Sequence, residues 1–158
     1  MSTTPTRPPT VPPAWVERTA WRIHRALYRL SGGRFLWRPS SKRGWGALRL
    51  TTTGRRTGQE RSVILGYVED GTDLVTLAMN GWQEGHPAWW LNLEAEPDAV
   101  VRVDGEMPRP VRAREATGEE RDRLWARWTA VNPQLDGYVA GRRTATPVVV
   151  LEVRPGTV

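Results

Sequence analysis

Short runs of alternating apolar and polar residues, separated by turn signals, fill most of the chain from residue 46 onward. Six of these runs predict β-strands, at 46–53, 61–69, 73–79, 99–103, 108–116 and 147–153. Asp70-Gly71, Asn80-Gly81 and Asp104-Gly105 stand between runs, and such dipeptides favour tight turns. Because no strand–helix–strand unit repeats, we expect an α+β, mainly β protein: antiparallel strands closed into a small barrel with flanking helices.

Two stretches with helical periodicity interrupt the strand series. The first opens at His86-Pro87-Ala88, with Pro87 at an early helical position, and it ends before Pro97. The second starts near Thr117, where Thr117 and Glu120 match a capping box. Its predicted apolar face consists of Leu124, Trp125, Trp128 and Val131. The stretch from there to the last strand is expected to be irregular.

The segments before the barrel differ from it in composition. Residues 1–13 are rich in proline and threonine and are expected to be a disordered tail. Residues 14–33 predict a basic amphipathic helix, and residues 44–155 carry the barrel. Packing on the barrel is the favoured role of this helix, and peripheral contact with the inner face of a membrane is the alternative.

Charge and composition narrow the classes of function. Lysine and arginine number 23 against 17 acidic residues, and the net charge of +6 favours an anionic partner. The absence of cysteine excludes disulfides and thiolate chemistry, and only two histidines are present, so no metal site is expected. No apolar run approaches the length of a membrane span and no signal-peptide pattern opens the chain, so we expect a cytoplasmic protein.

The loop between the first two predicted strands is the most distinctive segment. Gly54 and Gly58 bracket Arg55 and Arg56, and Arg61 follows. Glycine permits left-handed backbone, successive N–H groups can form an anion-binding nest, and arginine grips phosphate or carboxylate with two donors. These residues indicate an anion site, and a solvated hairpin tip is the alternative.

Taken in order, this loop, Asn80-Gly81, the segment His86-Pro87-Ala88-Trp89-Trp90-Leu91-Asn92-Leu93 and the final strand from Thr146 resemble the deazaflavin-dependent nitroreductase and quinone reductase family. The resemblance covers about residues 44–155. It implies a split β-barrel similar to that of FMN-binding oxidoreductases. It also implies coenzyme F420, a deazaflavin with a phosphate and a polyglutamate tail.

The resemblance implies site residues as well. Arg55, Arg56 and Thr57 would hold the phosphate and the start of the tail. The other implied cofactor-binding residues are Arg61, Ser62, Val63, Ile64, Leu65, Gly66, Leu77, Ala78, Met79, Asn80, Ala88, Trp89, Trp90, Leu91 and Asn92. For Trp89, Trp90, Leu91 and Leu93 an ordinary core position is the alternative, and Asn92 could instead satisfy a buried backbone group. Tyr138 lies where the family places aromatic residues over the substrate, which makes it a candidate substrate contact or proton donor.

The chain departs from the family pattern at several positions. Val63 and Ile64 stand where threonine and proline are usual, and Met79 replaces a small hydroxyl residue. Leu135 occupies a position where nitroreducing members tend to have tyrosine. These changes make the substrate pocket more apolar, and they put nitroimidazole reduction in doubt more than cofactor binding.

The resemblance predicts a reductase that uses reduced F420 to pass a hydride to an electron-poor quinone, enone or nitroaromatic. An FMN-dependent oxidoreductase on the same barrel is one alternative, since the arginine loop suits the FMN phosphate equally well. A basic module that binds nucleic acid or membrane without catalysis is another. The tryptophans do not alternate with arginine along one strand, so no nucleic-acid partner is expected. Monomer and homodimer both remain open.

Overall fold

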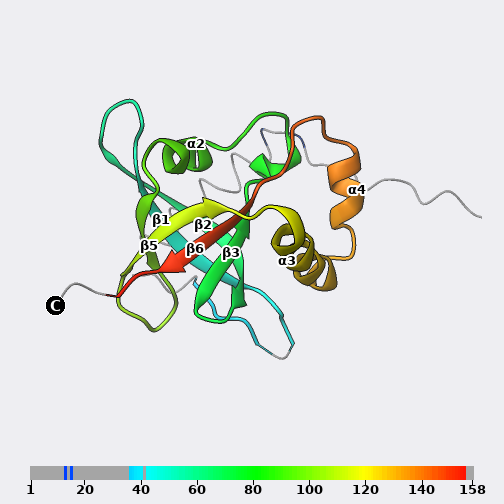
Figure 1. The fold of residues 1–158 in the computed structure, drawn as a ribbon, viewed down its shortest axis with the longest axis horizontal. Coiled ribbons are helices and arrows are strands. Elements are labelled where there is room, and N and C mark those ends of the chain that lie inside the picture. The colour runs from blue at the N-terminus through cyan, green and yellow to red at the C-terminus, as the bar shows by residue number, and fades with distance from the viewer. Residues whose placement is uncertain (1–12, 14, 16–35, 41, 156–158) are drawn as a thin grey trace, which may run out of the picture.

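The computed structural model describes residues 13, 15, 36–40 and 42–155 of the chain. Six antiparallel strands close into a barrel in the order β1-β2-β3-β6-β5-β4, as Figure 1 shows. The strands are β1 (Gly46–Thr53), β2 (Glu60–Asp70), β3 (Asp73–Leu77), β4 (Asp98–Arg102), β5 (Arg109–Glu115) and β6 (Val148–Val153). The predicted mainly β barrel is therefore confirmed. The predicted N-terminal tail and helix lie outside the described residues, apart from Pro13 and Trp15.

The predicted strands agree with the observed ones to within one residue at each end, with one exception. The third strand was expected to reach Met79 but ends at Leu77. After Leu77, the Ala78 N–H still donates to Pro147 O at 3.0 Å, and Met79 then takes a helical backbone conformation. A short 3-10 turn, η1 (Asn80–Trp82), leads the chain away from the sheet.

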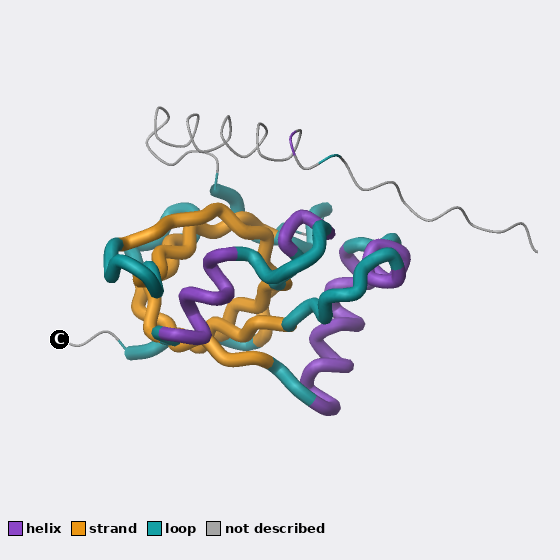
Figure 2. Tube along the Cα trace, turned by 90° about the horizontal axis from the view of Figure 1, so that it is seen from above, coloured by secondary structure: helices purple, strands orange, loops and turns teal. Residues whose placement is uncertain are grey.

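Apolar side chains fill the barrel on the inside and cover it on one outer face. The interior cluster includes Leu48, Tyr67 and Val101 from the strands and Trp90 and Leu93 from helix α2 (Ala88–Ala95). Helix α2 therefore lies across one end of the barrel, where Figure 2 shows it in front of the ring of strands. It begins at Ala88 rather than earlier, because Pro87 keeps an extended ψ of 149° and acts as the N-cap.

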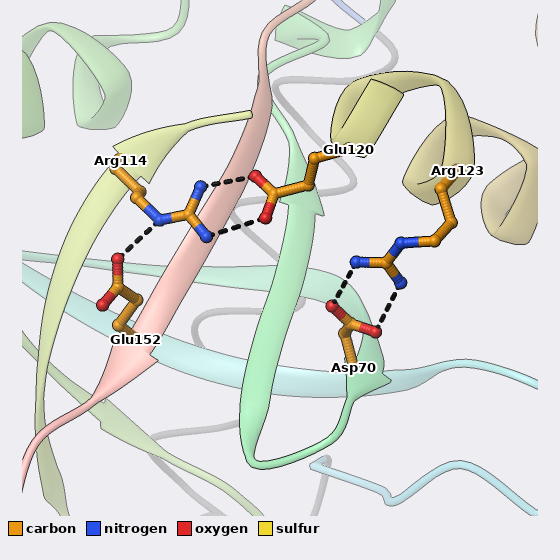
Figure 3. Close-up of polar contacts among 5 residues, drawn as sticks. All are labelled: Asp70, Arg114, Glu120, Arg123 and Glu152. Carbon is orange, nitrogen blue, oxygen red and sulfur yellow. Dashed lines mark hydrogen bonds and ion pairs between the residues drawn. The ribbon is translucent and has the colours of Figure 1, made fainter. Parts of the chain in front are cut away.

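Helix α3 (Gly118–Val131) packs on the outer face through Leu124, as its apolar pattern predicts. The predicted capping box is wrong, because the Thr117 side chain makes no cap hydrogen bond. The Glu120 carboxylate instead binds the Arg114 guanidinium of β5, with Nη2 to Oε2 at 2.9 Å (Figure 3). A two-pronged bond between charged groups is stronger than a bond to a backbone N–H, so Glu120 turns toward the barrel.

A second ion pair anchors the same helix to the barrel. Arg123 Nη1 and Nη2 lie 2.8 and 3.0 Å from the two oxygens of Asp70 at the end of β2 (Figure 3). Hydrogen bonds from arginine lower the pKa of both Asp70 and Glu120. Because these side chains are partly exposed to water, each pair contributes little stability and chiefly fixes where the helix sits.

Helix α4 (Leu135–Ala140) occupies the stretch expected to be irregular, and that expectation is wrong. Leu135 is buried in the outer cluster, and Trp125 Nε1 of α3 donates to Asp136 Oδ1 at 2.8 Å. Tertiary contacts thus stabilise a helix too short to form alone. Of the helices the structure describes, none is long and apolar enough to cross a membrane.

Candidate functional site

The loop between β1 and β2 is a tight turn closed by its own backbone. The Gly54 N–H donates to Gln59 O at 2.7 Å, and the Gly58 N–H donates to Gly54 O at 2.8 Å. A Cβ at Gly54 would lie 3.0 Å from Gln59 O, and Gly58 has a φ of +71°. Both positions therefore favour glycine. The turn leaves Arg55 and Arg56 exposed at its tip.

Asn92 of helix α2 fixes this loop to the barrel. Its Oδ1 accepts hydrogen bonds from Arg55 N at 3.1 Å and from Arg55 Nη1 at 3.3 Å. Its Nδ2 donates to Thr52 Oγ1 at 3.3 Å. Asn92 and Thr52 are both buried, so the amide gives the Thr52 hydroxyl a partner where water does not reach it. Asn92 thus binds a backbone N–H, as the alternative interpretation expected, although the residue that carries it, Arg55, is exposed.

The loop, the start of β2 and the start of α2 enclose a cleft of about 410 Å³, which we call the basic cleft. The exposed Arg56 and Arg61 line it, and within the described part of the chain neither guanidinium has a hydrogen-bond or ion-pair partner. Ala88 and Trp89 line the opposite side. Their N–H groups begin a helix and so have no acceptor within it. Uncompensated positive charge beside free N–H donors suits a phosphate or carboxylate.

A second pocket, also of about 410 Å³, opens further along β2 between the barrel and helices α3 and α4. Trp45, Trp82 and Trp128 line it, so we call it the tryptophan pocket. Gly66 supplies part of the wall, and a Cβ there would lie 3.4 Å from the Trp45 ring and 3.6 Å from the Trp128 ring. The lining Thr76 hydroxyl already donates to Gly66 O at 2.8 Å. These surroundings suit a flat, weakly polar molecule.

The structure distributes the predicted site residues over three places. Nine of them line the basic cleft: Arg55, Arg56, Thr57, Arg61, Ser62, Val63, Ala88, Trp89 and Asn92. Four others line the tryptophan pocket: Leu65, Gly66, Leu77 and Met79, together with Leu135. The two groups meet on β2, where Ser62 and Val63 face the cleft and Leu65 and Gly66 face the pocket.

The remaining predicted residues line neither cavity. Ala78 and Trp90 belong to the barrel core, and Ile64 packs with Leu36 and Ala47 in a separate buried cluster. Trp90 and Leu93 are thus core residues, as the alternative interpretation expected. Leu91 is half-buried, and Asn80 Nδ2 donates to Glu84 O at 2.9 Å. Tyr138 does not line the tryptophan pocket itself, but its ring stacks on Trp82, which does.

Several lining residues escape prediction from sequence. Trp45 and Trp82 lie outside the predicted elements, and Trp128 is indistinguishable from an ordinary helix-face residue. The one local signal is Asn80-Gly81, which predicts a turn at the place where Trp82 enters the wall. The tryptophan pocket therefore emerges only from the fold.

A closed barrel with a basic cleft beside an aromatic pocket is an arrangement that suits an anionic group next to a flat, weakly polar one. The family model described as F420H(2)-dependent quinone reductase matches residues 20–153. An F420H(2)-dependent quinone reductase of Mycobacterium tuberculosis (strain ATCC 25618 / H37Rv) is 32% identical over 154 residues, which cover 89% of this chain and 97% of that protein. The chain therefore belongs to the F420H(2)-dependent quinone reductase family.

Solved structures agree with this assignment. A structure described as an F420-H2 dependent reductase is 33% identical with a TM-score of 0.60, and the match covers 67% of this chain and 93% of that one. A structure described as a domain-swapped dimer is 28% identical with a TM-score of 0.63, over 88% of this chain and all of the other. The class of the protein is thus an oxidoreductase, and the cofactor of its family is coenzyme F420.

Proposed function

We propose that this protein transfers a hydride from reduced coenzyme F420 to a quinone. The anionic end of the cofactor binds in the basic cleft, and the quinone binds in the tryptophan pocket. The observation that carries the proposal is the adjacency of the two cavities along β2, where Val63 faces one and Leu65 the other. A single strand thus leads from unpaired arginines to an aromatic pocket.

The residues of the basic cleft fit the chemistry of the cofactor tail. Arg55 is already oriented by Asn92, whereas Arg56 and Arg61 have no partner in the described part of the chain and can bind a phosphate and a carboxylate. The N–H groups of Ala88 and Trp89 add donors on the other side, and the Trp89 ring supplies a flat wall. We assign cofactor binding to Arg55, Arg56, Thr57, Arg61, Ser62, Val63, Ala88 and Trp89.

The tryptophan pocket favours a quinone over a nitroaromatic acceptor. Met79 and Leu135 contribute apolar surface, and the Thr76 hydroxyl is occupied by Gly66 O. A quinone is less polar than a nitroaromatic and fits this mainly apolar lining better, and the Trp128 indole N–H, which has no partner among the described residues, is available to a quinone carbonyl oxygen. The Tyr138 hydroxyl points to Oε1 of Gln134, the N-cap residue of the same helix, at 3.4 Å. We therefore assign its ring, rather than its hydroxyl, a role at the site.

The chain supplies position and a dry pocket rather than a nucleophile. When bound, reduced F420 supplies a hydride from its C5 carbon. Arg56 and Arg61 hold the anionic end in place, and the tryptophans exclude water from the acceptor. The absence of cysteine from the chain is compatible with this chemistry, because none of these roles needs a nucleophilic thiol.

The test is a turnover assay with the full chain, reduced F420 and 1,4-naphthoquinone. The returning absorbance of oxidised deazaflavin should depend on protein concentration and saturate with both reactants. A nitroimidazole offered in place of the quinone should react more slowly. A rate no higher than that of the protein-free mixture would refute the proposal.

A further inference from the structure

Three consecutive residues at the edge of the tryptophan pocket have a left-handed backbone. Asn80, Gly81 and Trp82 have φ values of +49°, +60° and +63°. Glycine adopts this conformation freely and asparagine tolerates it, but a bulky residue such as tryptophan rarely does. The conformation at Trp82 therefore needs support from its surroundings, and such local strain is typical of functional sites.

The strained residue forms part of the pocket wall. The half-buried Trp82 indole stacks on the Tyr138 ring of α4, with ring centroids 5.3 Å apart and planes 6° from parallel. It also packs against the apolar cluster under α3 and α4. A different backbone conformation at residue 82 would swing this ring out of the stack and remove one wall of the tryptophan pocket.

Arg142 holds the turn from a distant part of the chain. Its side chain is buried, and Nε donates to Gln83 O at 2.9 Å while Nη2 donates to Gly85 O. Its Nη1 donates to Thr146 Oγ1 at 2.8 Å and reaches Ala78 O at 3.5 Å. The acceptors thus lie on both sides of η1. We call Arg142 and these acceptors the Arg142 clasp.

Glu84 adds bonds between the same two loops, from the 78–85 segment to the loop that carries Arg142. Its carboxylate accepts hydrogen bonds from Arg143 N at 2.8 Å, Thr144 N at 3.0 Å and Thr144 Oγ1 at 2.7 Å. A residue of the 78–85 segment therefore grips the loop that carries Arg142. The two loops are locked together by charged groups bonded to backbone, an arrangement that gives specific geometry.

We propose that Arg142 is a positioning residue that keeps Trp82 in its left-handed conformation, and so shapes the acceptor pocket. Arg142 lines neither the basic cleft nor the tryptophan pocket, so its effect on the acceptor passes through Trp82. The identity of the acceptor as a quinone rests on the proposed function. The clasp itself rests only on the contacts above.

The kinetic test is a double-mutant cycle between Arg142→Ala and Trp82→Gly in the full chain, with Arg142→Lys as the conservative variant. Arg142→Ala should raise the KM for 1,4-naphthoquinone about tenfold and leave F420 affinity within about twofold. In the Trp82→Gly background, Arg142→Ala should raise that KM no further than about twofold, because the wall is already gone. Arg127→Ala, at an exposed arginine of α3 that lines neither cavity and lies 3.8 Å from the Asp70 carboxylate, is the charge-matched control and should change neither quantity.

A second readout needs no turnover. The stacked Trp82–Tyr138 pair should give a near-UV circular dichroism signal that Trp82→Gly removes, Arg142→Lys weakens and Arg127→Ala retains. Quenching of tryptophan fluorescence by 1,4-naphthoquinone should be lowest in Trp82→Gly, intermediate in Arg142→Lys and unchanged in Arg127→Ala. If the wild type does not oxidise reduced F420, the proposed function fails, but the near-UV signal of the Trp82–Tyr138 pair, which needs no ligand, still decides the clasp.

Two results would overturn the inference. One is an additive cycle, in which Arg142→Ala raises the KM equally with and without Trp82. The other is a near-UV spectrum and quinone affinity of Arg142→Lys identical to those of the wild type. If Arg142→Ala does not fold, the same comparisons are made with Arg142→Lys, which keeps the charge but loses the forked donor.

Discussion

The proposed cofactor site depends on the Arg56 side chain, whereas the stability of the cofactor-free protein does not. It is exposed at the tip of the β1–β2 loop, and it has no partner in the described part of the chain. We predict that Arg56→Ala weakens F420 binding by about 1.5–3 kcal/mol, the scale of a hydrogen bond to a charged group. The thermal midpoint of the cofactor-free protein should stay nearly unchanged.

Fluorescence titration and thermal melting of the two proteins measure these effects. Arg154→Ala, an exposed arginine beyond β6, removes the same charge elsewhere and should leave F420 affinity close to that of the wild type. A fall in the melting temperature of Arg56→Ala with unaltered affinity would instead make Arg56 a structural residue.

Tyr67 shows the opposite case, a buried polar group that the site does not use. Its hydroxyl has no partner among the described residues, and burial raises the pKa of Tyr67 from about 10 to about 12. The folded state therefore disfavours the phenolate. The free energy of unfolding is therefore unaffected by Tyr67 ionisation below about pH 10, and it falls as the pH rises from there through about 12.

We predict that Tyr67→Phe is neutral or stabilising at pH 7, because it removes an unsatisfied hydroxyl without changing the ring. The variant should also lack the wild-type loss of stability between about pH 10 and 12. Urea unfolding at a series of pH values measures both effects. Destabilisation by more than about 1 kcal/mol at pH 7 would mean that the hydroxyl has a hydrogen-bond partner.

At the scale of elements, the joint between α2 and the β1–β2 loop depends on Asn92. Asn92→Ala removes the acceptor of Arg55 N and leaves the buried Thr52 hydroxyl without its donor. We predict a loss of about 1–3 kcal/mol in the free energy of unfolding, together with weaker F420 binding. The combined loss of stability and of F420 affinity distinguishes Asn92→Ala from Arg56→Ala, which should weaken binding alone.

Urea unfolding and F420 titration of the same preparation check the Asn92 prediction. The control is Glu94→Ala, at an exposed position of the same helix. Alanine is the best helix former, so neither substitution weakens the helix itself. Equal stability of Asn92→Ala and Glu94→Ala would show that the joint does not hold the loop.

The strands could be predicted because their signal is local. In β1, Leu48 and Leu50 face the core while Arg49 and Thr51 do not, and this alternation sets both the strand and its faces. The end of β3 and the whole of α4 could not be predicted in the same way. Gly137 and the preceding Pro133 disfavour a helix, and the bond from Trp125 to Asp136 that stabilises it joins two elements.

In the candidate site, too, residues with a local sequence signal could be predicted and residues placed by tertiary contacts could not. The arginine loop and the Ala88–Asn92 segment are recognisable in the sequence, although only the fold shows that Asn92 joins them. Arg142 gives no local signal, because the acceptors Ala78 and Gln83 lie 64 and 59 residues away in the chain. A buried arginine that binds backbone carbonyls looks like any surface arginine until the chain is folded.

At the scale of the whole molecule, the charge should act on one ligand and not on the other. The net charge of +6 attracts the anionic cofactor, whereas a quinone is uncharged. We predict that raising the salt concentration from about 0.05 to 0.5 M weakens F420 binding, because the Debye length shrinks to a few ångströms. The affinity for 1,4-naphthoquinone should stay constant.

Titrations at both salt concentrations, read by tryptophan fluorescence, test this difference. Parallel weakening of both ligands would mean that salt acts on the protein as a whole and not on the basic cleft. Insensitivity of F420 binding would contradict a cleft that works through unpaired arginines.

An equilibrium titration of the purified full chain with F420 and, separately, with FMN decides whether the basic cleft binds the deazaflavin cofactor. We expect saturable quenching of tryptophan fluorescence by F420 at micromolar concentration, since Trp89 lines the cleft. FMN, which lacks the glutamyl carboxylates, should bind more weakly. The absence of saturable F420 binding, or tighter binding of FMN, would mean that the basic cleft is not an F420 site.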